Sequence, residues 1–266
     1  MSGISSMEGK TALVSGVSND RSISWGIAKA MHEAGARVAL SYGPMMEKRV
    51  RPLAESIGCD FVEYCDATSD ENIEALFAKL ADRYGTIDAV AHGIVGAKRE
   101  DLSRPFVETS RDGFLLAQEL SVYSLVALTR AARPLMPEGG SVVTLSYHGS
   151  QKMMPSYNVM GVAKAALESA VRYLASDVGP QGIRVNAISA GPVRTLSAAG
   201  VGEFRNLYKV FPQVTPLRRH ISIEDVGAAA AFLASDAGAN ISGQVLYVDG
   251  GFNTLGMAMP PDEDEG

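Results

Sequence analysis

The chain has 266 residues, of which 46% are hydrophobic and 20% charged, a composition typical of a soluble globular protein. Its net charge of −6 argues against a nucleic-acid-binding surface, and no apolar run is long enough to span a membrane. The chain opens without a signal-peptide pattern and contains two cysteines and four scattered histidines, so we expect a cytoplasmic protein without a disulfide framework or a metal site.

Short apolar runs alternate with longer amphipathic segments along the chain. We expect strands at residues 11–15, 37–42, 60–65, 87–92, 141–145, 183–188 and 244–248. We expect helices at residues 22–34, 45–57, 69–83 (with Ser69 as N-cap), 113–136, 157–174 and 223–235. This alternation predicts an α/β fold, a Rossmann-like doubly wound parallel sheet of about seven strands with helices on both faces. We expect one domain over residues 1–256 and a disordered acidic tail at 257–266.

The ligand cleft of such a sheet lies at the carboxyl ends of its strands. After the first strand, residues 16–26 form a turn with glycines and serines that opens a helix, where amide groups and the helix dipole can hold a pyrophosphate. The turn lacks the G-x-G-x-x-G pattern, and a purely geometric role for Gly16 is the alternative. Its position after the first strand favours a dinucleotide site.

The next three strand ends are less specific. Residues 41–43 lack both the acid that usually grips an NAD ribose and an arginine for a 2′-phosphate. Asp66 could accept a hydrogen bond from an adenine amino group or simply cap a turn. His92 could be a catalytic acid, but a strand-end histidine satisfied by backbone groups is the favoured interpretation.

Residues 145–168 hold the strongest catalytic candidates. Tyr157, Gly161 and Lys164 are spaced to share one helical face, with the tyrosine and the lysine about 10 Å apart along the axis. A nearby ammonium lowers the pKa of a phenol, so Tyr157 could act as an acid or oxyanion stabiliser. The alternative is that Tyr157 packs in the core and Lys164 reaches the surface.

The sixth strand leads into a turn that contains Arg194 and Thr195, where the nicotinamide end of a cofactor would lie in such a sheet. Residues 196–211 are mildly amphipathic and interrupted by glycines. A mobile lid needs this kind of segment, and a plain surface connector is the alternative.

Several motifs together resemble one family. Residues 157–164 read Y-N-V-M-G-V-A-K, with six residues between tyrosine and lysine, and residues 184–192 read R-V-N-A-I-S-A-G-P. Tyr147 stands where ketoreductases have a serine, and Gly16, Ser22, Ile23 and Gly26 match the opening turn. The chain from residue 9 to about 256 resembles the NADH-linked bacterial enoyl-acyl-carrier-protein reductases of the short-chain dehydrogenase/reductase superfamily.

The resemblance implies NADH as cofactor and reduction of the 2,3 double bond of trans-2-enoyl thioesters, carried on acyl-carrier protein or CoA, in fatty-acid elongation. Tyr157 would bond the thioester carbonyl, Lys164 would hold the nicotinamide ribose, and Tyr147 would shape the acyl pocket or assist. The implied cofactor-binding residues are Gly16, Ser22, Ile23, Asp66, Ala67, Ile94, Lys164, Val193, Thr195 and Leu196. The implied substrate-binding residues are Val95, Ala97, Leu102, Tyr147, Tyr157 and Phe204.

Other readings stay open at this point. The chain could be an alkene reductase of a specialised biosynthetic pathway, or a catalytically silent NAD-binding regulator. The resemblance also implies a homotetramer, for which the apolar residues 227–234 could pack across a two-fold axis.

Two positions depart from the family pattern. Gly43 stands where a glutamine often meets the adenosine, and Val95 stands where glycine is common. Valine is stiff at χ1, so we expect it to crowd flat inhibitors such as triclosan while sparing the slender thioester. If the loop backbone shifts, Val95 would instead point into the core.

Overall fold

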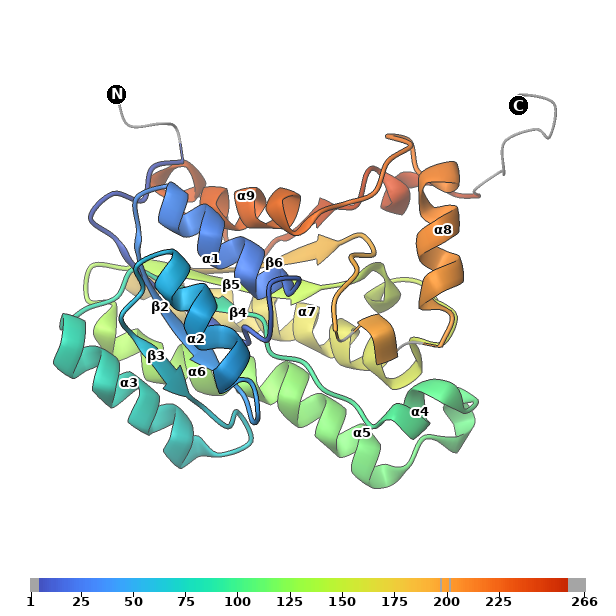
Figure 1. Ribbon diagram of the computed structural model, residues 1–266, viewed down its shortest axis with the longest axis horizontal. Helices are drawn as coiled ribbons and strands as arrows, with labels where there is room; N and C mark the ends of the chain where they lie inside the picture. Colours follow the sequence, from blue (N-terminus) through green and yellow to red (C-terminus); the bar gives the residue numbers. More distant parts are fainter. Residues whose placement is uncertain (1–4, 197, 201, 258–266) are drawn as a thin grey trace.

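The computed structural model describes residues 5–196, 198–200 and 202–257. Its seven strands are β1 (Thr11–Ser15), β2 (Arg37–Tyr42), β3 (Val62–Tyr64), β4 (Ala89–His92), β5 (Gly140–Ser146), β6 (Ile183–Ala190) and β7 (Val245–Val248). They form one parallel sheet in the order β3-β2-β1-β4-β5-β6-β7, which confirms the predicted fold class (Figure 1). The strand order reverses between β1 and β4, the position where ligands bind in such sheets.

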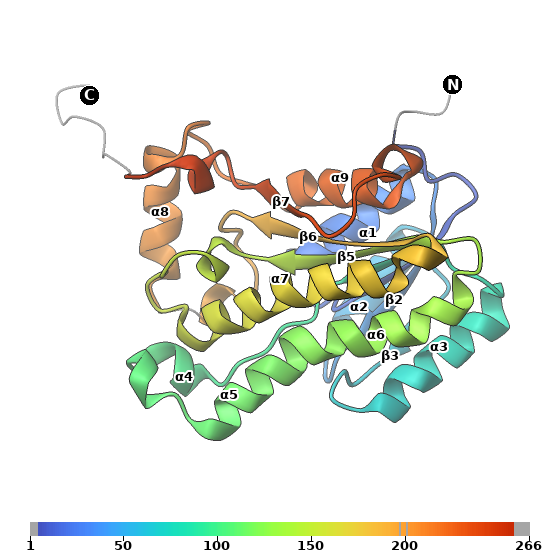
Figure 2. The ribbon, with the colours of Figure 1, turned by 180° about the vertical axis from the view of Figure 1, so that it is seen from behind.

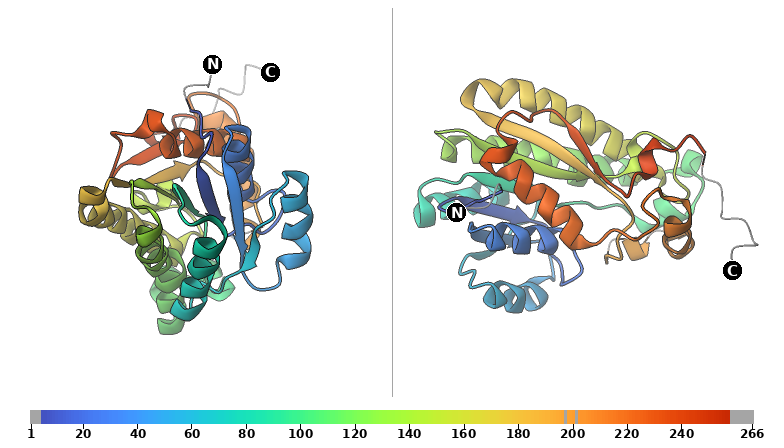
Figure 3. Two further views of the ribbon diagram at one scale, coloured as in Figure 1. Left: turned by 90° about the vertical axis from the view of Figure 1, so that its left-hand side faces the viewer. Right: turned by 90° about the horizontal axis from the view of Figure 1, so that it is seen from above.

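Helices cover both faces of the sheet (Figures 2 and 3). One face packs against α1 (Ile23–Glu33), α2 (Glu47–Ser56) and α9 (Ile223–Ala234), and the other against α3 (Asp70–Tyr84), α6 (Ser124–Ala132) and α7 (Asn158–Val178). Three further helices, α4 (Arg99–Ser103), α5 (Arg111–Gln118) and α8 (Phe204–Val214), lie near the carboxyl ends of the central strands. Short 3₁₀ turns occupy Phe106–Glu108, Arg133–Leu135, His148–Ser150, Gly179–Gln181, Ala198–Gly200, Asp236–Gly238 and Phe252–Thr254.

The predicted helix ends follow from local capping. The Ser22 hydroxyl accepts from the Trp25 amide at 3.3 Å at the start of α1, and the Ser69 hydroxyl accepts from the Asn72 amide at 3.1 Å at the start of α3. These bonds satisfy amide groups that a helix N-terminus otherwise leaves free. Ser69 is therefore the N-cap that the sequence predicts.

Helix α9 crosses α1 at two glycines. A Cβ on Gly26 would overlap the Ile223 carbonyl, and a Cβ on Gly227 would overlap the Gly26 carbonyl. Side chains are excluded here because the two backbones pack against each other. Val226, Ala230 and much of the rest of the apolar face of α9 are consequently buried within the chain. This face therefore gives no support to the expected packing across a two-fold axis.

The prediction of one continuous α-helix at residues 113–136 is wrong. This stretch is split by a π-helical segment, Glu119–Tyr123, between α5 and α6. The Ser124 hydroxyl donates to the Leu120 carbonyl at 2.8 Å, a side-chain bond that competes with the helical ladder. Single π turns of this kind are frequent at functional sites.

Other boundaries differ by smaller amounts. The sequence predicts neither α4 nor α8, and α7 runs four residues beyond the predicted end at residue 174. Of the predicted acidic tail, residues 258–266 lie outside the described part of the chain. No helix in the described residues is both long and apolar enough to cross a membrane.

Candidate active site

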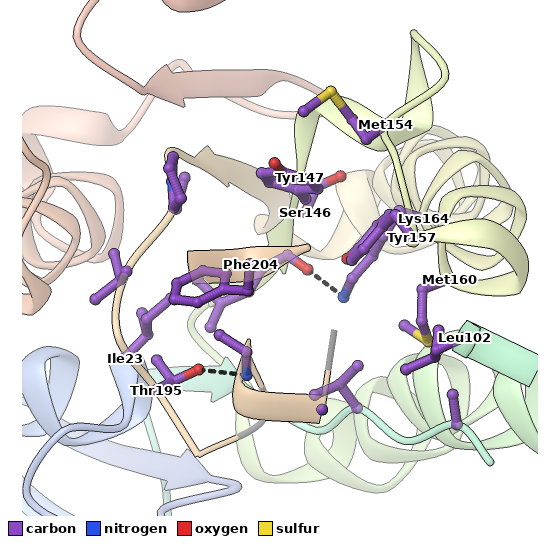
Figure 4. Close-up of a pocket in the computed structure, with 18 of the residues that line it drawn as sticks. Ile23, Leu102, Ser146, Tyr147, Met154, Tyr157, Met160, Lys164, Thr195 and Phe204 are labelled. Atoms are coloured by element: carbon purple, nitrogen blue, oxygen red, sulfur yellow. Dashed lines mark hydrogen bonds between the residues drawn. The ribbon is translucent and has the colours of Figure 1, made fainter. Parts of the chain in front are cut away.

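A cavity of about 410 Å³ opens at the carboxyl ends of the central strands (Figure 4). Thirteen predicted site residues line it, namely Gly16, Ser22, Ile23, Ile94, Val95, Ala97, Leu102, Tyr147, Tyr157, Lys164, Val193, Thr195 and Phe204. Asp66, Ala67 and Leu196 are not among its lining residues. The structure thus brings together residues from six separate stretches of the chain.

The turn after β1 has the shape that a dinucleotide site needs. Gly16 has a φ of +83°, and a Cβ there would lie 2.5 Å from the Gly93 carbonyl oxygen at the end of β4. The Ser22 hydroxyl donates to the Asn19 carbonyl at 2.8 Å and caps α1. A narrow glycine turn that ends at a helix N-terminus fits the phosphates of a dinucleotide.

Tyr147 and Tyr157 face each other across the cavity wall. Their ring centroids are 4.7 Å apart with 65° between the ring planes. A Cβ on Gly149 would lie 2.5 Å from Tyr157 Cδ1 and 3.3 Å from Tyr147 Cδ1, so only glycine leaves room for both rings. Ser156 and Asn158, which flank Tyr157, adopt positive φ values of 57° and 39°, uncommon for residues with a side chain.

The expected lowering of the Tyr157 pKa by Lys164 is wrong. Burial raises the pKa of Tyr157, and the neighbouring Tyr147 raises it further. Burial also raises the pKa of Tyr147 to about 12. Both phenols therefore hold their protons at neutral pH and can donate hydrogen bonds.

Lys164 does not reach the surface. Its side chain lines the cavity, the residue is only 5% exposed, and Nζ donates to the Leu145 carbonyl at 2.7 Å. Burial lowers its pKa to about 8, and the charge of Glu168 opposes this effect. The ammonium form is therefore retained near neutral pH.

Glu168 is a site residue that the sequence reasoning missed. It is buried, and its carboxylate accepts from the Ser146 hydroxyl at 2.5 Å, the Ser150 hydroxyl at 2.5 Å and Gln151 Nε2 at 2.7 Å. A signal was present, because Lys164 and Glu168 are the only charged residues between positions 158 and 171 and lie one helical turn apart.

Asp66 caps a turn, as the alternative interpretation held. Its Oδ1 accepts from the Thr68 amide at 3.0 Å and from the Thr68 hydroxyl at 2.8 Å. The Leu196 residue is 47% exposed, beside the turn that carries Thr195. Contacts of Asp66, Ala67 and Leu196 with a cofactor stay predictions.

His92 is buried between two hydroxyl groups. Nδ1 lies 2.8 Å from Thr144 Oγ1, and Nε2 lies 2.8 Å from Ser124 Oγ. Because the Ser124 hydroxyl donates to the Leu120 carbonyl, we assign the ring proton to Nε2. Burial lowers the pKa of His92 to about 3, helped by the charge of Lys164. Its partners are side chains rather than the expected backbone groups, and it does not line the cavity.

Val95 lies on the cavity wall and is 39% exposed, so the alternative in which it points into the core is wrong. The next residue, Gly96, lies against Leu120 in the π-helical segment, and a Cβ there would overlap Leu120 Cδ1, so the leucine side chain would have to shift. The loop after β4 therefore packs on Leu120 through Gly96, and Val95 lies on the cavity side of the loop.

Helix α8 covers the cavity with Phe204 and Leu207. The Arg194 guanidinium lies 4.3 Å from the Tyr208 ring centroid, and the Tyr208 and His220 rings stack at 3.8 Å with 7° between planes. This stack joins α8 to the segments before and after it. Residues 196–211 therefore include a cavity cover rather than only a connector.

A second cavity of about 320 Å³ lies beneath α8 and shares eight lining residues with the first, Tyr147 and Leu207 among them. Its remaining walls are largely apolar, with Val210, Phe211 and Phe252. Among the residues that the structure describes, no group of three histidine, cysteine or acidic side chains could hold a metal ion.

Comparison with known proteins agrees with this geometry. Residues 16–253 match the family model described as enoyl-(acyl carrier protein) reductase. The chain is 49% identical to enoyl-[acyl-carrier-protein] reductase [NADH] 1 of Rhizobium meliloti, over 94% of this chain and 93% of that protein. It is 50% identical to the corresponding NADH-linked reductase of Bacillus subtilis, over 93% of this chain and 97% of that protein.

Solved structures show the same architecture. The Aquifex aeolicus NADH-linked enoyl-[acyl-carrier-protein] reductase superposes with a TM-score of 0.93 and 48% identity, covering 96% of this chain and 100% of that one. The Bacillus cereus reductase, crystallised with NADP⁺ and indole naphthyridinone, gives a TM-score of 0.92 at 49% identity, covering 94% of this chain and 99% of that one. With its parallel sheet and the tyrosines and lysine at the sheet's edge, this chain belongs to the enoyl-(acyl-carrier-protein) reductase family of the short-chain dehydrogenase/reductase superfamily.

Proposed function

We propose that this chain is an NADH-dependent reductase of the 2,3 double bond of trans-2-enoyl thioesters carried on acyl-carrier protein, acting in fatty-acid elongation. One observation carries the proposal: the two protonated phenols and the buried ammonium meet in the same cavity as the glycine turn before α1. Family membership points to the same reaction.

The residues around the cavity fit a nicotinamide dinucleotide. Its phosphates would lie at the turn that begins with Gly16 and ends at the capped start of α1. Ile94, Val193 and Thr195 would line the cofactor, and Lys164 would donate to ribose hydroxyls. When bound there, the reduced nicotinamide supplies a hydride to the β-carbon of the substrate.

Tyr157 has the central role in our proposal. Reduction at the β-carbon places negative charge on the thioester oxygen, and the Tyr157 hydroxyl donates a hydrogen bond to that oxygen. Because burial raises the pKa of Tyr157, the phenol keeps its proton while it stabilises the enolate. Protonation of the α-carbon then completes the reduction and restores the thioester carbonyl. Tyr147 packs against the Tyr157 ring in an edge-to-face arrangement and forms part of the pocket wall.

Apolar side chains would hold the acyl group and exclude water from the reacting carbons. Val95, Ala97, Leu102 and Phe204 supply this surface. Exclusion of water strengthens the hydrogen bond from Tyr157, because the local dielectric is low.

Purified protein should oxidise NADH when it is given trans-2-enoyl thioesters of acyl-carrier protein. The assay should compare straight-chain substrates of several lengths, as carrier-protein and CoA thioesters. Absence of oxidation with every substrate would refute the proposal. Tight NADH binding in the same preparation without turnover would identify a cofactor-binding regulator instead.

We also propose a cytoplasmic location and a homotetramer. Both rest on family membership. Light scattering at the mass of a monomer would contradict the tetramer.

A further inference from the structure

We propose that Glu168 is a positioning residue that ties the segment carrying Tyr147 to the helix carrying Lys164 and supplies the negative charge that balances the buried ammonium. This inference rests on the proposed function for its consequences in catalysis. Glu168 does not line the cavity, so it acts on the reaction through its neighbours.

Glu168 is only 2% exposed, and the three hydrogen-bond donors to its carboxylate all come from one short segment. Oε1 accepts from the Ser146 and Ser150 hydroxyls, each at 2.5 Å, and Oε2 accepts from Gln151 Nε2 at 2.7 Å. Ser146 directly precedes Tyr147, and Ser150 follows it by three residues. The donors therefore hold the segment on both sides of the tyrosine.

This anchoring matters because the position of the segment on α7 sets the spacing of the two tyrosine rings. Gly149 packs so closely on the rings of Tyr147 and Tyr157 that its backbone position decides their spacing. A Cβ on Gly161 would lie 2.9 Å from the Gly149 carbonyl oxygen, so the segment also rests directly on α7. Release of the bonds to Glu168 would let the segment, and Tyr147 with it, move away from α7.

Glu168 also lies one helical turn after Lys164 on the same helix, and both are buried. Lys164 Nζ donates to the Leu145 carbonyl, which is neutral, so the bond itself supplies no countercharge. An isolated ammonium in such surroundings is strongly disfavoured. The Glu168 carboxylate opposes this effect and raises the pKa of Lys164.

Other titratable groups around the pair come from several elements. They are His92 on β4, Tyr147 and His148 after β5, Tyr157 before α7, Lys152 in the following loop, and Tyr247 and Asp249 at β7. The buried His92 is neutral, and the phenols keep their protons near neutral pH. Glu168 is the acid whose charge acts on Lys164. It also acts on His148 and Tyr247, as does Asp249.

Two substitutions separate the charge of Glu168 from its anchoring bonds. In Glu168→Gln, the amide oxygen still accepts from both serines, and the Gln151 amide can turn to face the new NH₂ group. In Ser150→Ala, the charge stays and one anchoring bond is lost. Exposed Glu74 on α3 provides a matched control, Glu74→Gln.

The first measurement is NADH affinity against pH, followed by cofactor fluorescence without substrate. Affinity should fall in the wild type as Lys164 loses its proton at high pH. Glu168→Gln should move this alkaline limb to lower pH by about 1 pH unit, the scale of a nearby opposite charge. Ser150→Ala and Glu74→Gln should keep the wild-type limb.

The second measurement is kcat with an enoyl thioester. Ser150→Ala should lower kcat roughly tenfold, since small displacements of positioning groups are costly, while Glu74→Gln should leave it unchanged. A wild-type alkaline limb in folded Glu168→Gln would overturn the charge role, and unchanged kcat in Ser150→Ala would overturn the anchoring role. If the wild type binds NADH but reduces no thioester, the proposed function fails while the affinity profile still tests Glu168.

Discussion

The edge of one phenol ring meets the face of another where Tyr147 lies against Tyr157, with centroids 4.7 Å apart and planes at 65°. The two residues come from different elements, Tyr147 from the turn after β5 and Tyr157 from the N-cap of α7. Burial raises the pKa of both hydroxyls. The cavity therefore offers two hydrogen-bond donors, and their separate roles can be tested by removing one oxygen at a time.

Tyr157→Phe should lower kcat by roughly 10²-fold or more, the scale for loss of an oxyanion donor. NADH affinity should stay near the wild-type value, because the ring still packs against Tyr147. Steady-state kinetics and cofactor fluorescence measure the two quantities. Tyr147→Phe is the matched control and should have a smaller effect on kcat. Equal losses of NADH affinity and kcat in Tyr157→Phe would show that the hydroxyl binds the cofactor instead.

Lys164→Met should abolish NADH binding and catalysis together, yet it should gain stability relative to the wild type at neutral pH. Burial lowers the Lys164 pKa from its ordinary 10.5 to about 8, so the charged side chain disfavours folding below pH 8 by about 3 kcal/mol. Loss of the bond to the Leu145 carbonyl offsets part of this gain.

The stability difference for Lys164→Met has a defined pH dependence. Between pH 8 and 10.5 the unfolded wild type holds a proton that the folded protein has lost, so wild-type stability rises with pH. The advantage of the methionine variant should therefore shrink across this window in denaturant titrations. A difference that does not vary with pH would mean that Lys164 is not desolvated.

His92→Leu should reduce the free energy of unfolding by about 2 kcal/mol, because two buried hydrogen bonds are lost. The pH profile of kcat between pH 5 and 8 should keep its shape, since the neutral ring of His92 neither titrates in this range nor lines the cavity. A fall in kcat of about 10²-fold in the folded variant would instead indicate that His92 is a catalytic acid.

Val95→Gly should make the enzyme more sensitive to triclosan by roughly ten- to a hundredfold. The branched side chain of Val95 stands on the cavity wall and is stiff at χ1, so a flat rigid inhibitor meets it more severely than a slender thioester does. Inhibition curves of the two proteins with the same substrate decide the point. Overlapping curves would show that Val95 does not meet the inhibitor.

NADH should be preferred over NADPH by about tenfold or more in kcat/KM, the scale of one missing hydrogen bond to the charged 2′-phosphate. β2 is followed by Gly43, and the Arg51 guanidinium on α2 is paired with the Glu47 carboxylate at 2.7 Å rather than free for a phosphate. A Cβ on Gly43 would meet no atom within 4 Å, so Gly43→Arg is sterically allowed. The new guanidinium could pair with the 2′-phosphate, so this substitution should reduce the preference for NADH over NADPH. A wild-type preference for NADPH would contradict the argument.

Much of the fold was determined by local sequence pattern. Buried parallel strands are continuous apolar runs, and their alternation with amphipathic segments predicts a parallel sheet covered by helices, of which the doubly wound sheet is the form observed. Since parallel strands all end at the same edge, Gly16 and Thr195 could be assigned to one site without a structure, and the family resemblance added Ile94 and Tyr147. Ser69 could also be predicted as an N-cap from the sequence, because capping involves only residues that are neighbours in the chain.

The tertiary structure alone decided features that depend on burial and on contacts between distant segments. The pKa of Tyr157 is raised, not lowered, because burial removes the phenol from water and the neighbouring Tyr147 adds to this effect. The apolar face of α9 packs on α1 through Gly26 and Gly227, a pairing that no periodicity reveals. The spacing of Glu168 from Lys164 is visible in the sequence, but its three hydrogen-bond donors are not, since they come from the Tyr147 segment and meet the carboxylate only in the folded chain.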